Sequence, residues 1–204
     1  MMKPDTHIRN NCWDVLPEQF IEKIKLLTPP EHLEETMSSF CDTKSVTFRT
    51  NTLKISTENL RKKLDAGGIK YGIVPWYKDA FVLRSPKQNL TATSLFSEGL
   101  LYIQSLSSML AVLALDPKPD ENILDLTAAP GSKTSHIAML MQDTGQLVAN
   151  DISRTRLYKL RSNLETQGVT NTKVLNFPGQ MLWKKFPEYF DKVLVDAPCT
   201  MEGR

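Results

Sequence analysis

Two residues near the end of the sequence have types and spacing that could do chemistry. They are the acid and the thiol of Asp196-Ala-Pro-Cys199, directly after the apolar run Val193-Leu-Val195. A thiolate can add to an electron-poor ring, and a carboxylic acid beside it can stabilise the product by a hydrogen bond or a proton transfer. A free cysteine is also a common inert core residue. The position after Asp-Ala-Pro favours the reactive interpretation.

A second segment, DLTAAPGSKT from Asp125 to Thr134, follows another apolar run. Its small residues let a ligand approach the backbone, and the helix expected next points its N-terminus at that ligand. These small residues are Ala128, Ala129, Gly131 and Ser132. The segment is not a P-loop, because Leu126 stands where that motif needs its first glycine. Alone, such a turn is weak evidence for a ligand site.

Asp151 ends the next apolar run along the chain. An acid at this place after a strand accepts hydrogen bonds from both ribose hydroxyls of a nucleoside cofactor. The alternative is that Asp151 caps the helix that follows, a role that also suits Ser153.

The elements that must position these residues alternate between strand and helix. Strands are predicted at 122–126, 146–151, 173–177 and 192–196, and helices at 132–141 and around Leu157, Leu160 and Leu164. This alternation predicts a parallel α/β sheet with right-handed crossovers, of order 3-2-1-4, with ligands at the carboxyl ends of its strands.

The chain before this sheet shows a different pattern of predicted helices and strands. A helix is predicted at 16–27, ended by Thr28-Pro29-Pro30. An alternating strand at 45–54, a helix after the cap Ser56, short strands at 69–74 and 81–84, and an apolar helix at 104–115 form a small α+β unit. Gln104 and Ser107 could touch RNA or seal the domain interface. With Asp116–Pro119 as a boundary, the expected domains are 1–44, 45–115 and 116–204.

The net charge of +2 says little about partners, but its distribution says more. Residues 44–87 hold ten lysines and arginines, Arg49 among them, and three acids. Aromatic residues are interleaved with these cations: Phe48, Tyr71, Trp76 and Tyr77. This combination suits a phosphate backbone with stacked bases. The alternative is a solvated lysine-rich face.

Composition excludes several classes of protein. With 41% hydrophobic and 24% charged residues the chain can bury a core, so disorder is not expected. It has no apolar run long enough for a membrane span and no secretory signal. Three cysteines (Cys12, Cys41 and Cys199) do not make a disulfide framework, which favours the cytoplasm. The histidines have no metal-ligand spacing with these cysteines, so no metal is expected.

Together the motifs DLTAAPGSKT, VANDIS and VLVDAPC, in this order, resemble the Sun (Nol/Nop/Sun) family of RNA cytosine-5 methyltransferases, with the ribosomal RsmB and RsmF types nearest. FRTNTLK, VPW and LLYIQSLSSML extend the resemblance over residues 45–204. It implies a Rossmann-like class I methyltransferase sheet, here of about four strands, after a helical and small α+β RNA-binding region. It also implies S-adenosylmethionine as cofactor and RNA as partner, ribosomal RNA before transfer RNA, in a monomer without a membrane.

The resemblance also implies roles for residues. The loop that would cradle the methionine part of the cofactor consists of Thr127, Ala128, Ala129, Pro130, Gly131, Ser132 and Lys133. Asp151 would bind the ribose. Lys133 and Asp196 would face the cytosine, Asp196 also near the cofactor's amino group. Cys199 would be the first of the family's two cysteines and would assist release.

The sequence departs from the family pattern at several places. Thr127 replaces a cysteine, Ser132 a glycine, and Pro178 an aspartate that binds the adenine amino group. The nucleophilic cysteine of a later Thr-Cys motif is absent before Arg204, so we expect a fragment of a longer protein.

Three alternatives to the family's usual mechanism follow from these residues. Cys199 could itself be the nucleophile, as in DNA cytosine-5 methyltransferases. The chain could instead bind RNA or cofactor without turnover. An amino-methyltransferase is disfavoured, because DAPC has neither a second proline nor an aromatic ring.

Overall fold

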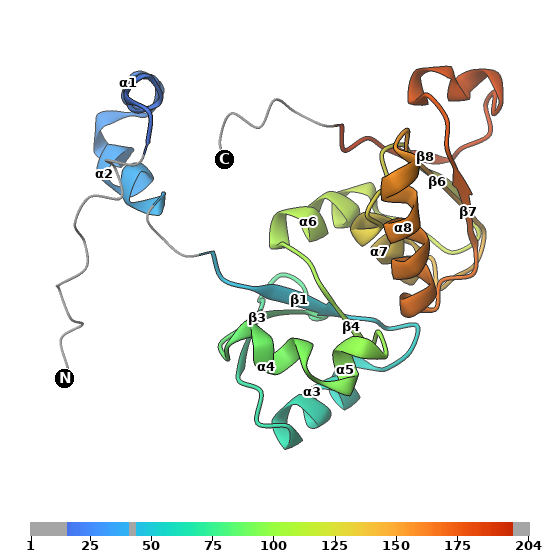
Figure 1. Cartoon of the computed structure of the whole chain (residues 1–204), viewed down its shortest axis with the longest axis horizontal. Coiled ribbons are helices and arrows are strands. Elements are labelled where there is room, and N and C mark those ends of the chain that lie inside the picture. Colours follow the sequence, from blue (N-terminus) through green and yellow to red (C-terminus); the bar gives the residue numbers. More distant parts are fainter. Residues whose placement is uncertain (1–15, 41–43, 198–204) are drawn as a thin grey trace. The chain divides into compact units, whose positions relative to one another are not determined.

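The computed structural model describes residues 16–40 and 44–197. The chain divides into two compact units, residues 1–45 and 46–204. The larger unit contains two four-stranded sheets (Figure 1). The boundary predicted at Asp116–Pro119 therefore falls between two sheets of one compact unit, and the division into three domains stays a prediction. No helix among the described residues is long and apolar enough to cross a bilayer.

The first sheet is antiparallel, with strand order β2-β3-β1-β4. Its strands are β1 (Thr47–Thr50), β2 (Tyr71–Ile73), β3 (Ala80–Leu83) and β4 (Leu101–Ile103). The helices α3 (Thr57–Ala66), α4 (Lys87–Thr91) and α5 (Ser94–Ser97) contribute to the core on one face of this sheet. The sequence predicts β1, β2, β3 and α3, but β4, α4 and α5 are too short to show a period.

Helix α3 begins as its sequence predicts. The Ser56 hydroxyl accepts a hydrogen bond from the Asn59 amide at 3.2 Å, which satisfies one free N–H of the first turn. Leu60 and Leu64 are fully buried and pack with Phe48 and Phe81, whose rings stack at 5.2 Å. This apolar cluster fixes α3 on the sheet.

Strand β1 is shorter than the predicted 45–54, and all four of its residues are buried. Alternation predicts one buried face, but Arg49 on the other face is covered by α7. For three residues this burial corrects the prediction that the basic segment, residues 44–87, contacts phosphates and bases. Arg49 is 0% exposed, and Phe48 and Tyr77 are buried too, so these three cannot meet a phosphate or a base, whereas Trp76 is half-exposed.

The second sheet is parallel, with strand order β7-β6-β5-β8. Its strands are β5 (Asn122–Asp125), β6 (Gln146–Asn150), β7 (Thr172–Leu175) and β8 (Lys192–Leu194). In chain order this is 3-2-1-4, so the predicted order and the α/β Rossmann-like class are confirmed. The order of strand addition reverses between β5 and β8, because β6 and β7 lie on one side of β5 and β8 on the other. This is the topological switch point where such sheets bind ligands.

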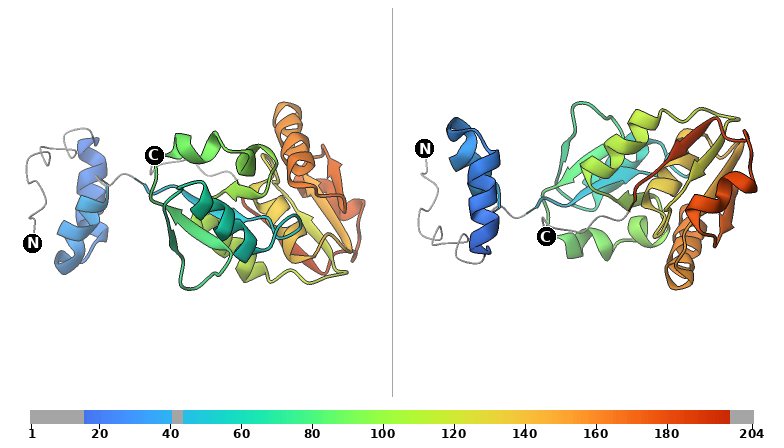
Figure 2. Two further views of the ribbon diagram at one scale, coloured as in Figure 1. Left: turned by 90° about the horizontal axis from the view of Figure 1, so that it is seen from below. Right: turned by 90° about the horizontal axis from the view of Figure 1, so that it is seen from above.

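The two faces of the parallel sheet are covered differently (Figure 2). One face carries α6 (Leu106–Leu115), α7 (Ser132–Leu140) and α8 (Arg154–Gln167). Leu157, Leu160 and Leu164 are the buried apolar row of α8, as their spacing predicts. The other face carries the 3-10 helix η2 (Gly179–Lys184) and the segment after it.

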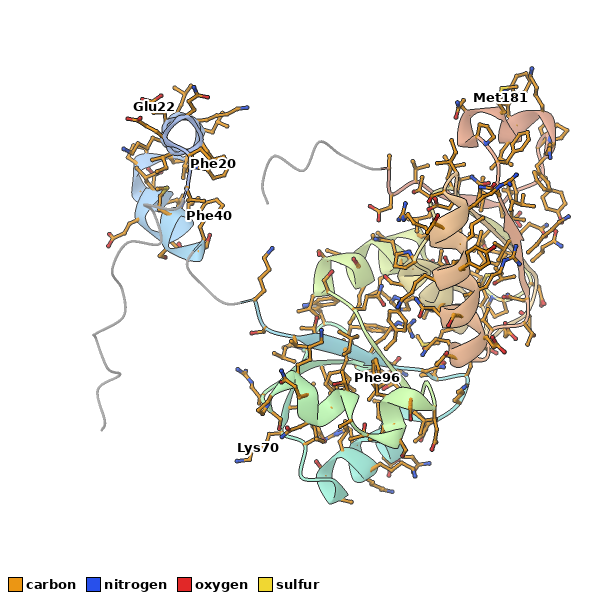
Figure 3. All side chains as sticks on the ribbon, viewed as in Figure 1. Phe20, Glu22, Phe40, Lys70, Phe96 and Met181 are labelled. Carbon is orange, nitrogen blue, oxygen red and sulfur yellow. The ribbon has the colours of Figure 1, made fainter. Side chains whose placement is uncertain are left out.

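The described part of the smaller unit contains two helices, α1 (Glu18–Leu27) and α2 (Pro30–Ser39). The rings of Phe20 and Phe40 meet edge to face at 5.5 Å (Figure 3). Helix α1 confirms the prediction for 16–27, but α2 is not predicted. Pro30 is the first residue of α2. The backbone N–H of a first helical residue has no partner within the helix, so a proline costs nothing there.

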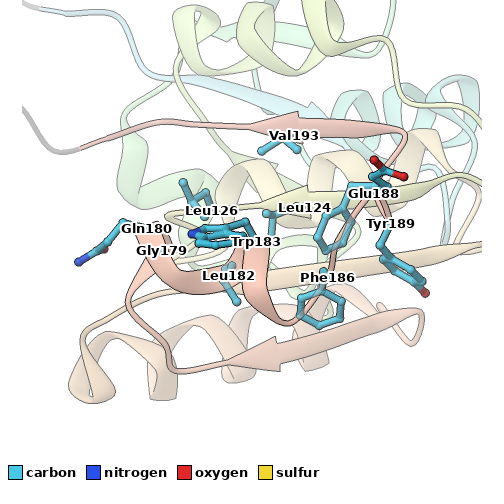
Figure 4. Close-up of a pocket in the computed structure, with 11 residues that line it drawn as sticks. Leu124, Leu126, Gly179, Gln180, Leu182, Trp183, Phe186, Glu188, Tyr189 and Val193 are labelled. Atoms are coloured by element: carbon cyan, nitrogen blue, oxygen red, sulfur yellow. The ribbon is translucent and has the colours of Figure 1, made fainter.

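A pocket of about 360 Å³ lies between η2 with its following segment and the strands β5 and β8 (Figure 4). Leucine and aromatic side chains line most of it, including Leu124, Leu182 and Phe186. None of the predicted site residues that the structure describes lines this pocket.

The two sheets are joined through the side chain of Arg49. Its guanidinium donates to Gln104 Oε1 at 2.8 Å and to Ser135 Oγ of α7 at 2.9 Å, and it lies over the Tyr102 ring at 5.3 Å. Burial lowers the pKa of Arg49 to about 10, so the group stays charged at neutral pH. Gln104 therefore belongs to the interface between the sheets.

Arg49→Ala is expected to destabilise the fold by about 2–4 kcal/mol, because it leaves buried acceptors unpaired and opens a cavity. Urea unfolding measures the effect. The matched control is Arg84→Ala, an exposed arginine after β3, with a change within about 0.5 kcal/mol. Equal losses for the two variants would contradict the role given to Arg49.

Candidate active site

The loops after β5 and β8 meet at the switch point. The Thr127 hydroxyl donates to the Asp196 carbonyl at 2.8 Å. Lys133 Nζ, on α7, lies 2.5 Å from Asp196 Oδ2 and 3.5 Å from Ser108 Oγ of α6. The Lys133 side chain is 16% exposed and that of Asp196 57%, so the acid faces solvent while the cation is held behind it. The pair therefore places the Asp196 carboxylate, a hydrogen-bond acceptor, at the strand ends with the Lys133 cation fixed beside it.

The small-residue loop is held from the side by α8. Asn163 Nδ2 donates to the Pro130 carbonyl at 2.7 Å, and the Arg156 guanidinium donates to the Ala129 carbonyl. Gly131 packs against Leu160: a Cβ on this glycine would lie 2.8 Å from Leu160 Cδ1. The loop geometry therefore depends on helix α8 as much as on its own residues.

Asp151 lies directly after β6 and beside this loop, with 2% of its surface exposed. Its Oδ2 accepts from the Ala129 amide at 3.2 Å and pairs with Arg156 at 3.1 Å, and its Oδ1 accepts from the Ser153 amide at 2.9 Å. Ser153, and not Asp151, is the N-cap of α8. Asp151 thus links the small-residue loop to the start of α8, and its role toward a ribose stays a prediction.

Asp125, at the end of β5, is buried beneath the loop. The Thr134 hydroxyl donates to its Oδ2 at 2.7 Å. Burial raises the pKa of Asp125 to about 6, an effect that the Thr134 hydrogen bond and Lys133 oppose. The sequence marks Asp125 only as the first residue of the motif.

Two asparagines that sequence reasoning missed fix the strand ends. Asn150 Nδ2 donates to the carbonyls of Leu126 and Phe177, at 3.1 and 3.0 Å, and so ties β5 to β7 across β6. Asn176 Nδ2 donates to the carbonyls of Asp151 and Ile152, both at 2.8 Å. The VANDIS motif includes Asn150, which is the one signal that could have identified it.

The remaining predicted positions are placed as follows. Ala128 and Ala129 are buried, and Ser132 and Lys133 open α7. Pro178 precedes η2 and offers no side-chain acceptor. Cys199 lies outside the described residues. The structure therefore brings together the loop, Asp151 and Asp196, and leaves their individual roles as predictions.

Family comparisons agree with this geometry. Residues 112–204 match the family described as 16S rRNA methyltransferase RsmB/F, and residues 16–106 match the N-terminal domain of 16S rRNA methyltransferase RsmF. The chain belongs to this RsmB/RsmF, or Sun, family of methyltransferases.

Individual relatives give the same result. Ribosomal RNA small subunit methyltransferase F of Vibrio campbellii is 40% identical over 193 residues, which are 92% of this chain and 40% of that protein. The enzyme of the same name from Aeromonas salmonicida is 38% identical over 195 residues, covering 92% of this chain and 41% of that protein. The chain thus spans about 40% of the length of these curated relatives.

Solved structures show the same fold. A methyltransferase homolog protein from Pyrococcus horikoshii has a TM-score of 0.78 and 36% identity, covering 91% of this chain and 64% of that one. NSun6 from Pyrococcus horikoshii, solved with SFG, has a TM-score of 0.77 at 24% identity and covers 90% of this chain and 71% of that one.

Gly131→Ala is expected to lower the free energy of unfolding by about 1–3 kcal/mol, because Gly131 has φ +103°, which an alanine rarely adopts. Chemical unfolding measures the loss. Gly72→Ala is the control, since an added Cβ there makes only ordinary contact with Arg84. A neutral Gly131→Ala would show that the loop is not held in this conformation.

Asp125→Asn tests the raised pKa of Asp125. An unfolded carboxyl has a pKa of about 3.9, so the folded chain binds more protons between about pH 4 and pH 6, and stability falls as the pH rises through that window. The stability gained by the substitution should therefore be about 2 kcal/mol larger at pH 7.5 than at pH 4.5.

Urea unfolding at the two pH values measures this difference. The control is Asp65→Asn, which removes an exposed carboxyl on α3 and should change stability by no more than about 0.5 kcal/mol. A pH-independent effect of Asp125→Asn would refute the assignment.

Proposed function

We propose that this chain forms the cofactor site and the base-facing acid of an enzyme that methylates C5 of a cytosine in RNA, with ribosomal RNA as the substrate. The observation that carries the proposal is the Lys133–Asp196 pair, joined to the small-residue loop at the switch point of the sheet. Membership of the RsmB/RsmF family supports ribosomal RNA as substrate. Transfer RNA is the second candidate.

The residues present fit S-adenosylmethionine. Asp151 sits beside the small-residue loop at the end of the neighbouring strand, the place where an acid in this kind of sheet meets a ribose. Ile152 is 69% exposed next to Asp151 and offers an apolar surface to an adenine ring. Pro178 supplies no acceptor for the adenine amino group. When bound, the cofactor supplies an electrophilic methyl group.

Asp196 is suited to the substrate base. Its carboxylate is exposed, and Lys133 holds one oxygen at 2.5 Å. A carboxyl at N3 of cytosine stabilises the ring once a thiolate has added to C6, which makes C5 nucleophilic. After C5 has taken the methyl group, a base removes the C5 proton and the C6–sulfur bond breaks, which releases the thiolate. Cys199 is one candidate for that thiol.

Asp196→Asn is expected to lower methyl transfer by at least about 100-fold, the usual contribution of a positioned acid. The assay uses the protein expressed from its complete reading frame, with methyl-tritiated S-adenosylmethionine and 16S ribosomal RNA. Bisulfite sequencing locates the methyl group.

The control for this assay is Asp120→Asn. Asp120 is exposed and has φ +65°, a conformation that asparagine tolerates, so this variant should keep full activity. Label at C5 that depends on Asp196 supports the proposal. Label on an exocyclic nitrogen, or binding of RNA and cofactor without transfer, contradicts it.

A further inference from the structure

Helix α8 carries an unusual distribution of charge. Its first eight residues hold four cations and no acid: Arg154, Arg156, Lys159 and Arg161. Cations near a helix N-terminus oppose the helix dipole, so this placement works against helix stability. Where a local rule is broken in this way, a functional reason is expected. The position of Arg156 is explained by its ion pair with Asp151. No ion pair among the described residues explains the other three cations.

Two of these arginines line a pocket of about 320 Å³, together with Leu157, Tyr158 and Asn176. Arg154, Tyr158 and Arg161 follow the i, i+4, i+7 spacing of one helix face, so the tyrosine lies between the two arginines along that face. Tyr158 is 77% exposed. Within residues 16–40 and 44–197, neither Arg154 nor Arg161 forms an ion pair with a carboxylate.

The wall of this pocket is fixed by Asn176 at the end of β7. Asn176 Oδ1 accepts from Arg154 Nε at 3.1 Å, and its amide donates to the carbonyls of Asp151 and Ile152. Arg154 is thereby oriented before any ligand binds. An oriented guanidinium loses less freedom on binding a phosphate.

We propose that this face of α8 binds a strand of the RNA substrate: Arg154 and Arg161 contact phosphates, and a base stacks on Tyr158. The inference rests on RNA being the substrate, as proposed above. Paired arginines provide the planar donors that phosphates prefer, and an exposed ring between them provides a platform that any base can use. An acidic peptide would use the charges but not the ring.

The test measures binding of a 5′-fluorescein-labelled U20 oligonucleotide to the whole chain by anisotropy, between 50 and 300 mM salt. Arg154→Glu with Arg161→Glu should raise Kd by at least about tenfold and lower the slope of log K against log salt by about 1.4, since each phosphate contact on a single strand contributes about 0.7. Tyr158→Ala should raise Kd by about fivefold or more and leave the slope unchanged.

The matched control is Lys159→Glu with Lys173→Glu, which makes the same change of net charge at exposed lysines outside the pocket. It should change Kd by less than about threefold. The pocket variants should keep the melting temperature of the unmodified chain, because both arginines are exposed and glutamate at 154, the first residue of α8, suits a helix N-terminus.

Equal losses of U20 affinity for the pocket and control variants would overturn the inference. A second contrary result has two parts: the chain binds poly-glutamate, an acidic peptide, through the two arginines, and Tyr158→Ala leaves RNA binding unchanged. If the unmodified chain binds S-adenosylmethionine but not U20, the RNA substrate itself is refuted together with this surface. If U20 binds and all variants behave alike, only the α8 surface is refuted.

Discussion

The buried guanidinium of Arg49 is the contact on which the arrangement of the larger unit depends. Within the described residues it forms no ion pair with a carboxylate, and its donors and ring face are used by Gln104, Ser135, the Thr50 carbonyl and the Tyr102 ring. A buried charge is tolerated only when its donors are satisfied. Because Ser135 belongs to α7, this requirement fixes the antiparallel sheet against the helix that begins at the small-residue loop.

The same dependence continues through the loop to α8 and the strand ends. Lys133 on α7 holds Asp196, Asn163 and Arg156 on α8 hold the loop carbonyls, and Asn150 ties the ends of β5 and β7. Each of these contacts joins elements far apart in the sequence. The site is therefore a property of packed helices and strand ends together, and the loop motif alone does not determine its shape.

Much of the fold could be predicted because its signals are local. The apolar strands, the cap at Ser56 and the leucine row of α8 each follow from a short stretch of sequence, and their alternation implies the strand order. Arg49 could not be predicted as buried, because a strand of four residues with one arginine looks half-exposed until the second layer is known. The roles of Asn163 and Arg156 could not be predicted for the same reason, because the loop carbonyls that they bind lie more than twenty residues away along the chain.

Local contacts and backbone conformation explain why the structure tolerates the three residues that depart from the family pattern. The Thr127 hydroxyl donates to the Asp196 carbonyl, a bond that a thiol would make more weakly, so this exchange strengthens the link between the two loops. Ser132 is the first residue of α7 and has no positive φ, so a glycine is not required there. Pro178 precedes η2, where its fixed φ of −59° costs nothing. The backbone of the site thus tolerates all three residues, and only at Pro178 is a polar group lost.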